Sequence, residues 1–196
     1  MTLYRAPEPG ATSSIKEWSA DVFYGRFTQR LIAALSTPTG EGELYEVDMQ
    51  LRPSGTKGPV AVSFTAFEDY YEREAETWEL LALTRARVVW ASSPQFAEAA
   101  AGAVESALRR PRDRARTAAD VRDMRALLER ERPPKGEWDL KLSPGGLVDI
   151  EFLAQYFALI APLSGLSGVE RDPGTEATLV PLGPSFLEPA DLDAVI

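Results

Sequence analysis

Between Leu44 and Arg52, polar side chains alternate with apolar ones. The polar side chains belong to Glu46, Asp48, Gln50 and Arg52, and the apolar ones to Tyr45, Val47, Met49 and Leu51. Successive side chains of a β-strand point to opposite faces, so this pattern predicts a half-buried strand with one polar face. Carboxylates can bind a divalent cation or accept a proton, and a guanidinium can bind phosphate oxygens. This polar row is therefore the first candidate for a site of chemistry.

The same alternation is also typical of a surface strand whose polar face is simply solvated. In that alternative, Arg52 forms a salt bridge with Glu46 or Glu43 instead of binding a phosphate. The residue pattern alone leaves both interpretations open.

A short β-hairpin and several helices should position this strand. Pro53 cannot donate to a sheet, so the strand should end at Arg52, and the apolar run Val60–Val62 is predicted to be its antiparallel partner. Apolar residues at helical spacing predict helices at about 19–36, 66–89, 94–108, 118–131 and 147–160, with short ones at 175–182 and 189–196. We therefore expect an α+β fold, with a small sheet and helices in residues 1–92 and only helices in residues 93–196. The arginine-rich stretch at 109–114 is interpreted as a solvated connection between two helices.

Cysteine and histidine are absent from the 196 residues, which excludes a disulfide framework, a thiolate nucleophile and the commonest general base. Acid–base or metal chemistry must then use carboxylates, whose oxygen atoms suit Mg²⁺ or Mn²⁺ better than zinc. The net charge of −9 disfavours nucleic acid and anionic membranes as partners. The sequence has neither a signal-peptide pattern nor an apolar run of membrane-spanning length, so a cytoplasmic protein is expected.

Two stretches closely resemble one family of bacterial enzymes. They are LYEVDMQLRPSG at residues 44–55 and GPVAVSFTAFEDYYEREAETWELLALTRARVV at residues 58–89. Both resemble the bifunctional glutamine-synthetase adenylyltransferases, which are polymerase-beta-like nucleotidyltransferases, and the adenylyl-transferring half more than the adenylyl-removing half. The resemblance implies transfer of AMP from ATP to a tyrosine of glutamine synthetase, with Mg²⁺ (or Mn²⁺) as cofactor. It also implies a nitrogen-regulatory signalling protein as a further partner.

Within this resemblance, Asp48 matches the third carboxylate of the active site, so we expect it to bind the metal and to act in catalysis. Arg52 would lie on the same face, four residues after Asp48 and beyond Gln50, and is expected to bind the nucleotide. Three positions depart from the family pattern, which has arginine, tryptophan and histidine where this chain has Gln50, Glu76 and Leu80.

Two further groups of residues are nucleotide-binding candidates. Arg85, together with Glu79 and Arg87, matches charged positions of the family, and buried ion pairs that fix a helix to the sheet are the alternative for all three. Lys141 is a nucleotide-binding candidate because Gly145-Gly146 follow it and precede an apolar helix, where free N–H groups could bind an anion.

A Gly-Ser turn followed by an Asp-x-Asp strand supplies the first two metal ligands in this superfamily, and no such motif occurs in residues 1–196. Residues 1–92 are therefore expected to be a partial nucleotidyltransferase domain, and residues 93–196 a helical domain truncated at its carboxyl end. One hypothesis is a segment of an adenylyltransferase that is inactive in isolation. The alternative is a non-catalytic helical module that binds glutamine synthetase or a nitrogen-signalling regulator.

Overall fold

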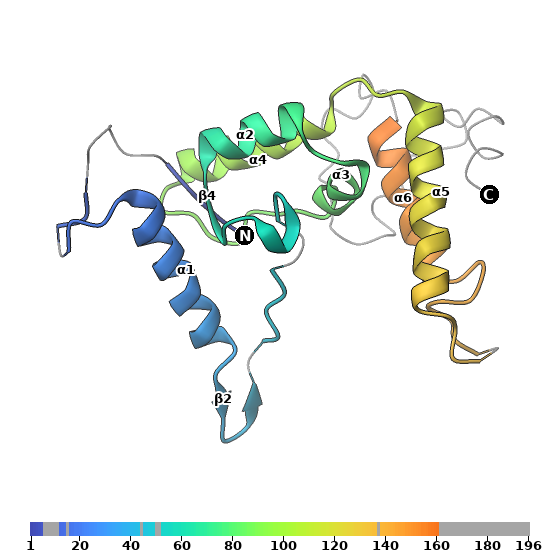
Figure 1. Cartoon of the computed structure of the whole chain (residues 1–196), viewed down its shortest axis with the longest axis horizontal. Helices are drawn as coiled ribbons and strands as arrows, with labels where there is room; N and C mark the ends of the chain where they lie inside the picture. Colours follow the sequence, from blue (N-terminus) through green and yellow to red (C-terminus); the bar gives the residue numbers. More distant parts are fainter. Residues whose placement is uncertain (6–11, 15, 44, 50–51, 137, 161–196) are drawn as a thin grey trace. The chain divides into compact units, whose positions relative to one another are not determined.

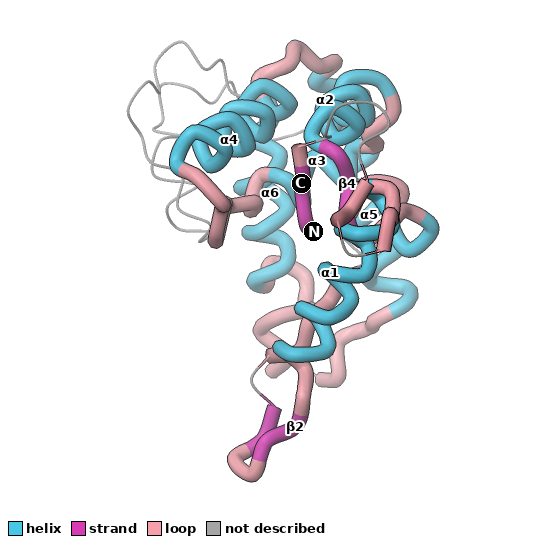
Figure 2. The backbone as a smooth tube through the Cα atoms, turned by 90° about the vertical axis from the view of Figure 1, so that its left-hand side faces the viewer, coloured by secondary structure: helices cyan, strands magenta, loops and turns pink. Residues whose placement is uncertain are grey.

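The structure is a computed structural model that describes residues 1–5, 12–14, 16–43, 45–49, 52–136 and 138–160 (Figure 1). The chain divides into one compact unit at Met1–Ala75 and a second that begins at Glu76. Helices make up most of the described residues and the strands are short, as the tube in Figure 2 shows. The expected α+β class is confirmed in this broad sense, whereas the expected domain boundary after residue 92 stays a prediction.

The first unit is built around a two-stranded parallel sheet of β1 (Thr2–Tyr4) and β4 (Ala61–Ser63). Two helices, α1 (Ala20–Leu35) and α2 (Phe64–Arg73), both contact the sheet. The buried apolar residues of this unit are Tyr4, Ala61, Val62, Phe67 and Tyr71. The core therefore lies where the two helices meet the sheet.

Local signals set the ends of both helices. The hydroxyl of Ser63 accepts a hydrogen bond from the N–H of Ala66 at 3.2 Å and so caps the start of α2. Helix α1 lies between Ser19 and Ser36, as predicted. Its apolar residues at a spacing of four are partly exposed, and α1 instead stacks Tyr24 on Tyr4 of the sheet with ring centroids 4.4 Å apart.

The predicted strand at Leu44–Arg52 is wrong over the residues that the structure describes, because residues 45–49 have no regular secondary structure. Tyr45, which the alternation placed on the buried face, has 61% of its surface exposed, and Val47 and Met49 are only half-buried. The remaining residues of that strand's interior lie outside the described residues, namely Leu44, Gln50 and Leu51. The alternation of polar and apolar residues predicts which side chains would face the core of a strand. It does not supply the neighbouring strand with which the backbone N–H and C=O groups must form hydrogen bonds.

The pairing of β4 explains why residues 45–49 do not form the predicted strand. The predicted antiparallel hairpin of residues 60–62 with residues 44–52 is wrong, because β4 pairs in parallel with β1. The hairpin that forms is earlier and shorter, between β2 (Pro38–Thr39) and β3 (Gly42–Glu43). Beyond it, the N–H of Tyr45 donates to the carbonyl of Leu35 at 3.1 Å.

The second unit packs α5 (Arg114–Glu131) and α6 (Leu147–Ile160) against α3 (Thr77–Leu83), and α4 (Pro94–Leu108) also contacts α3. Its buried apolar residues are Leu80, Leu81, Leu83, Ala100, Ala107, Leu108, Ala118, Val121, Val148, Ala154, Tyr156, Phe157 and Leu159. No helix in the described part of the chain is both long and apolar enough to span a membrane.

The predicted bounds of α4 and α6 are confirmed. Ser93 accepts a hydrogen bond from the N–H of Phe96 at 3.2 Å, with proline in the first turn, which is a strong start signal. Helix α5 begins at Arg114, four residues earlier than predicted, because the carboxylate of Asp113 caps it by accepting from the N–H of Arg116 at 3.0 Å.

A polar network fixes the turn between α5 and α6. The guanidinium of Arg125 in α5 donates to the carboxylate of Asp149 in α6 and, at 3.2 Å, to the carbonyl of Leu142 in the turn. The other carboxylate oxygen of Asp149 accepts from the N–H of Gly145 at 2.5 Å. One partly buried ion pair thus joins two helices and the segment between them.

Two features inside this turn keep it compact. Asp139 accepts hydrogen bonds from the N–H groups of Lys135, Leu142 and Lys141, which hold the pKa of its carboxyl below the ordinary value. Gly145 has a φ of 77°, and a Cβ atom on Gly146 would lie 2.6 Å from the carbonyl oxygen of Leu140 and 2.7 Å from that of Ser143. Position 146 therefore has no room for a side chain, and the positive φ at position 145 favours glycine.

The core of the first unit yields a first prediction. Phe67 is 1% exposed and its ring lies 4.6 Å from that of Tyr71, so Phe67→Ala leaves a cavity. We expect a loss of about 3–5 kcal/mol in the free energy of unfolding, measured by urea denaturation. The matched control is Phe27→Ala in α1, where the side chain is 49% exposed, with an expected loss of about 1 kcal/mol or less. Equal effects of the two substitutions would contradict this description of the core.

The turn of the second unit yields another. Gly146→Ala forces a methyl group against two carbonyl oxygens, so we expect it to destabilise the second unit by about 1–3 kcal/mol. Gly102→Ala is the control, since a Cβ atom there meets nothing within 4 Å inside α4 and alanine should stabilise the helix by about 0.5–1 kcal/mol. Urea denaturation of both variants measures the two effects, and the same sign for both would count against the turn geometry.

Candidate active site

The candidate active site of the first unit is the segment 45–49, which carries Asp48. The side chains of Glu46 and Asp48 are both exposed, as expected for the polar row. An exposed carboxylate can accept a proton or a hydrogen bond from an incoming hydroxyl group. The segment also lies close to the amino terminus, because the amino group of Met1 is 3.8 Å from the Sδ atom of Met49.

Arg52, the second predicted site residue, has only 9% of its surface exposed, and its guanidinium binds its own loop. Its Nε donates to the carbonyl of Gly58 at 2.9 Å, its Nη2 to that of Thr56 at 3.0 Å, and its Nη1 to that of Met49. These bonds use three of the five N–H groups of the guanidinium. Sequence reasoning weighed a phosphate or a glutamate as the partner of Arg52 and missed the carbonyls. A nucleotide-binding role for Arg52 stays a prediction.

Two more groups support this loop, and neither was predicted. The N–H of Ser54, whose φ is 61°, donates to the hydroxyl of Tyr70 in α2 at 3.0 Å. A Cβ atom on Gly58 would lie 2.0 Å from the carbonyl oxygen of Pro53, so the chain can pass there only as glycine. Burial, and then the positive charge of Arg52, lower the pKa of the Met1 amino group below its ordinary value.

The charged residues of α3 and of the segment after it differ in exposure and in their partners. Nη1 of Arg85 lies 3.7 Å from Oε1 of Glu151 in α6, and both side chains are partly exposed. Glu79 is buried, and its carboxylate accepts from the N–H of Glu76 at 3.0 Å at the start of α3. Arg87 is exposed. The alternative of a buried ion pair to the sheet does not describe Arg85, because its pair is exposed and leads to α6. Nucleotide binding by Arg85 stays a prediction.

Lys141 is exposed on the turn before α6, and its nucleotide-binding role likewise stays a prediction. The predicted free N–H groups of the following glycines are wrong for the described structure. The N–H of Gly145 donates to Asp149, and that of Gly146 donates to the carbonyl of Ser143 at 2.8 Å. Both N–H groups therefore donate to acceptors of the turn and of α6, and neither is available to an anion.

The residues described here do not form a complete site for a divalent cation. No group of three or more acidic, histidine or cysteine side chains in the described residues could hold a metal ion. Asp48 and Glu46 provide carboxylates in the right segment, but Mg²⁺ requires near-octahedral oxygen coordination. We therefore assign no step of the chemistry to a metal ion.

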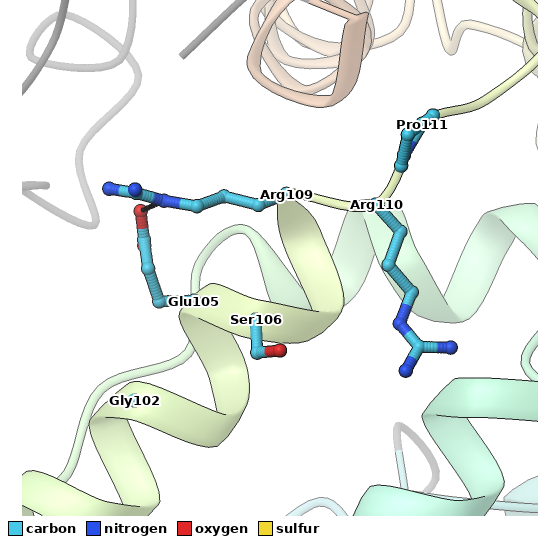
Figure 3. A pocket seen from close by; sticks show the side chains of 6 residues that line it. All are labelled: Gly102, Glu105, Ser106, Arg109, Arg110 and Pro111. Carbon is cyan, nitrogen blue, oxygen red and sulfur yellow. Dashed lines mark hydrogen bonds and ion pairs between the residues drawn. The ribbon is translucent and has the colours of Figure 1, made fainter. Parts of the chain in front are cut away.

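A pocket at the end of α4 is lined by Gly102, Glu105, Ser106, Arg109, Arg110 and Pro111 (Figure 3). Arg109 is paired with Glu105 at 2.6 Å, and the side chains of Arg109 and Arg110 extend to different sides. The next arginine, Arg112, donates to the carbonyls of Ala107 and Leu108 at the end of α4, and its burial lowers the pKa of its guanidinium. The arginine-rich stretch connects α4 to α5, as predicted, and its Arg112 satisfies two backbone carbonyls at the end of α4.

Comparison with known proteins places this sequence in a family. A model of the glutamate-ammonia ligase adenylyltransferase family matches residues 1–125, and one of the GlnD PII-uridylyltransferase family matches residues 115–177. A bifunctional glutamine synthetase adenylyltransferase/adenylyl-removing enzyme from Caulobacter vibrioides is 73% identical over 159 residues, which are 81% of this chain and 16% of that enzyme. Enzymes of the same name from Rhizobium meliloti and Agrobacterium fabrum are 53% and 50% identical over 171 residues, or 87% of this chain and 17% of each enzyme.

This chain thus spans about a sixth of the length of the curated relatives that it matches. The first family model covers the whole first unit, including Asp48 and Arg52, and continues through α3, α4 and part of α5. The chain therefore belongs to the glutamate-ammonia ligase adenylyltransferase family.

Proposed function

We propose that this chain supplies a catalytic carboxylate, Asp48, to an enzyme that transfers AMP from ATP to a tyrosine of glutamine synthetase. Family membership supports the reaction, and the exposed Asp48 carboxylate in the matched region is the observation that supports the site. Because the chain spans about a sixth of these relatives, the whole reaction is proposed for the full-length enzyme and not for this chain alone.

The proposed chemistry is an in-line displacement at the α-phosphorus of ATP. The tyrosine oxygen attacks this phosphorus, the bond to the bridging oxygen of the β-phosphate breaks, and pyrophosphate leaves with that oxygen. Asp48 orients the tyrosine hydroxyl and accepts its proton as the new phosphorus–oxygen bond forms. A divalent cation supplies charge neutralisation on the triphosphate in such reactions, and the described residues do not hold one by themselves.

Two exposed cations of the second unit are proposed to bind the triphosphate. The ion pair of Arg85 with Glu151, at 3.7 Å and partly in solvent, is weak enough for a phosphate to replace the carboxylate. Lys141 projects from a turn whose backbone is fixed by the Arg125–Asp149 pair, so its ammonium group is presented from a rigid support.

A second candidate function is a non-catalytic module that binds glutamine synthetase or a nitrogen-signalling protein. It is favoured by large apolar residues of the second unit that have more than two thirds of their surface exposed, namely Val89, Trp90, Trp138 and Leu140. Such side chains often contribute most of the energy of a protein interface. Binding to purified glutamine synthetase that is lost in Trp138→Ala but kept in Asp48→Asn would favour the module.

For the isolated chain we expect no measurable transfer of AMP. One catalytic carboxylate, without a complete cation site in the described residues, supplies too little of the positioning and charge stabilisation on which phosphoryl transfer depends. The measurement is incubation of the purified chain with labelled ATP, Mg²⁺ and glutamine synthetase. Incorporated label that disappears in Asp48→Asn would show that the chain already holds a complete site.

A chimera tests the catalytic role directly. The 159 matched residues of the Caulobacter vibrioides enzyme are replaced by those of this chain, and AMP transfer is measured with labelled ATP. We expect an active chimera in which Asp48→Asn lowers kcat by about 10²–10⁴-fold, the usual contribution of a general base.

Glu46→Gln in the same chimera is the matched control, because Glu46 is an exposed carboxylate in the same segment. We expect it to keep most of the activity. Equal activity of the Asp48→Asn and unsubstituted chimeras would contradict the assignment, and a loss shared equally by both variants would make Asp48 one of two interchangeable charges.

A further inference from the structure

The segment that carries Asp48 has no strand ladder to hold it. Residues 45–49 have no regular secondary structure, so their backbone groups are not fixed by a neighbouring strand. At its start, the N–H of Tyr45 donates to Leu35 at the end of α1. At its other end, the carbonyl of Met49, the residue directly after Asp48, accepts a hydrogen bond from the guanidinium of Arg52.

Arg52 connects this end of the segment to the core of the first unit. Besides the carbonyl of Met49, it binds the carbonyls of Thr56 and Gly58 at 3.0 and 2.9 Å, which lie at the far side of the loop. The chain continues from Gly58 into β4, whose Ala61 and Val62 are buried. The side chain of Arg52 thus connects Met49, next to Asp48, with Gly58, three residues before β4.

We propose that Arg52 is a positioning residue that holds the backbone at Asp48 in place, and that it is not a ligand of the triphosphate. This inference rests on the proposed function, because it assigns to Arg52 the task of placing the carboxylate that the reaction uses. A planar guanidinium can hold three diverging carbonyls at once, whereas the single ammonium group of lysine cannot reach all of them.

The burial of Arg52 supports positioning over phosphate contact. Only 9% of the residue is exposed, and three of its five N–H groups already point at carbonyls. A triphosphate would be limited to the two remaining N–H groups unless it displaced one of these carbonyls, which would then lose a charged donor. Arg85 and Lys141 are exposed, and the ion pair that a phosphate would replace at Arg85 is itself in contact with solvent.

The test measures a distance distribution, and the absence of native cysteine permits clean spin labelling. Glu46→Cys and Glu68→Cys, both exposed, place labels on the segment and on α2 of the same unit. Gln29→Cys with Glu68→Cys forms the reference pair between α1 and α2. Double electron–electron resonance is recorded for both label pairs in the chain with Arg52 and in the Arg52→Lys variant. Arg73→Lys is the matched control, since Arg73 is an exposed arginine of α2.

Arg52→Lys is expected to add a second, broad distance population for the 46–68 pair and to leave the 29–68 pair unchanged. Loss of one hydrogen bond to a charged group shifts an equilibrium between held and released loops by about tenfold, enough to make the released state visible. Arg73→Lys should change neither pair. An unchanged 46–68 distribution overturns the proposal, and so does broadening of both pairs, because it would show general loosening of the unit.

Equilibrium binding of ATP to the full chain separates positioning from phosphate contact. If Arg52 only positions the loop, the Kd of Arg52→Lys for ATP stays close to that of the unsubstituted chain. Loss of a charged hydrogen bond to phosphate would instead raise Kd about tenfold, and that result overturns the proposal. Neither measurement needs catalytic turnover. If AMP transfer by the chimera did not depend on Asp48, the proposed function would be contradicted, whereas the distance measurement would still test the role of Arg52.

Discussion

A guanidinium that leaves water must find hydrogen-bond acceptors inside the protein, because neither its charge nor its N–H groups can be removed. Arg52 meets this constraint with the carbonyls of Met49, Thr56 and Gly58. These hydrogen bonds connect the two ends of the loop through the side chain of Arg52, and the one to Gly58 lies three residues before β4. The place of Asp48 in the first unit therefore depends on how a buried cation satisfies its donors, and not on a strand ladder.

The second unit solves a similar problem with a different partner. Arg125 also binds a carbonyl of an irregular segment, that of Leu142, but its main partner is the carboxylate of Asp149. That carboxylate in turn holds the N–H of Gly145, so the network closes on itself. In both units an arginine stabilises a stretch that has no regular structure, and in both a candidate site residue, Asp48 or Lys141, lies in the stretch that is held.

Local signals made much of the helical part predictable. Ser19, Ser93 with Pro94, and the apolar run that starts at Leu147 mark helix ends through caps and spacing that a few neighbouring residues determine. The parallel pairing of β1 with β4 was not predictable in this way, because it joins residues about sixty positions apart and depends on tertiary packing. The carbonyl partners of Arg52 could not be predicted either, since every residue offers a carbonyl and composition cannot select among them. The exposure of Asp48 followed from the polar row even though the strand did not form.

The hydrogen bond from Nε of Arg52 to the carbonyl of Gly58 can be observed directly by nuclear magnetic resonance. If Arg52 anchors the loop, its Nε–H gives a slowly exchanging signal at neutral pH and a scalar coupling across the hydrogen bond to the carbonyl carbon of Gly58. Arg73, whose side chain is 70% exposed, serves as the internal reference for a guanidinium in solvent. An Nε–H of Arg52 that exchanges with water as fast as that of Arg73, with no coupling to Gly58, would contradict the account.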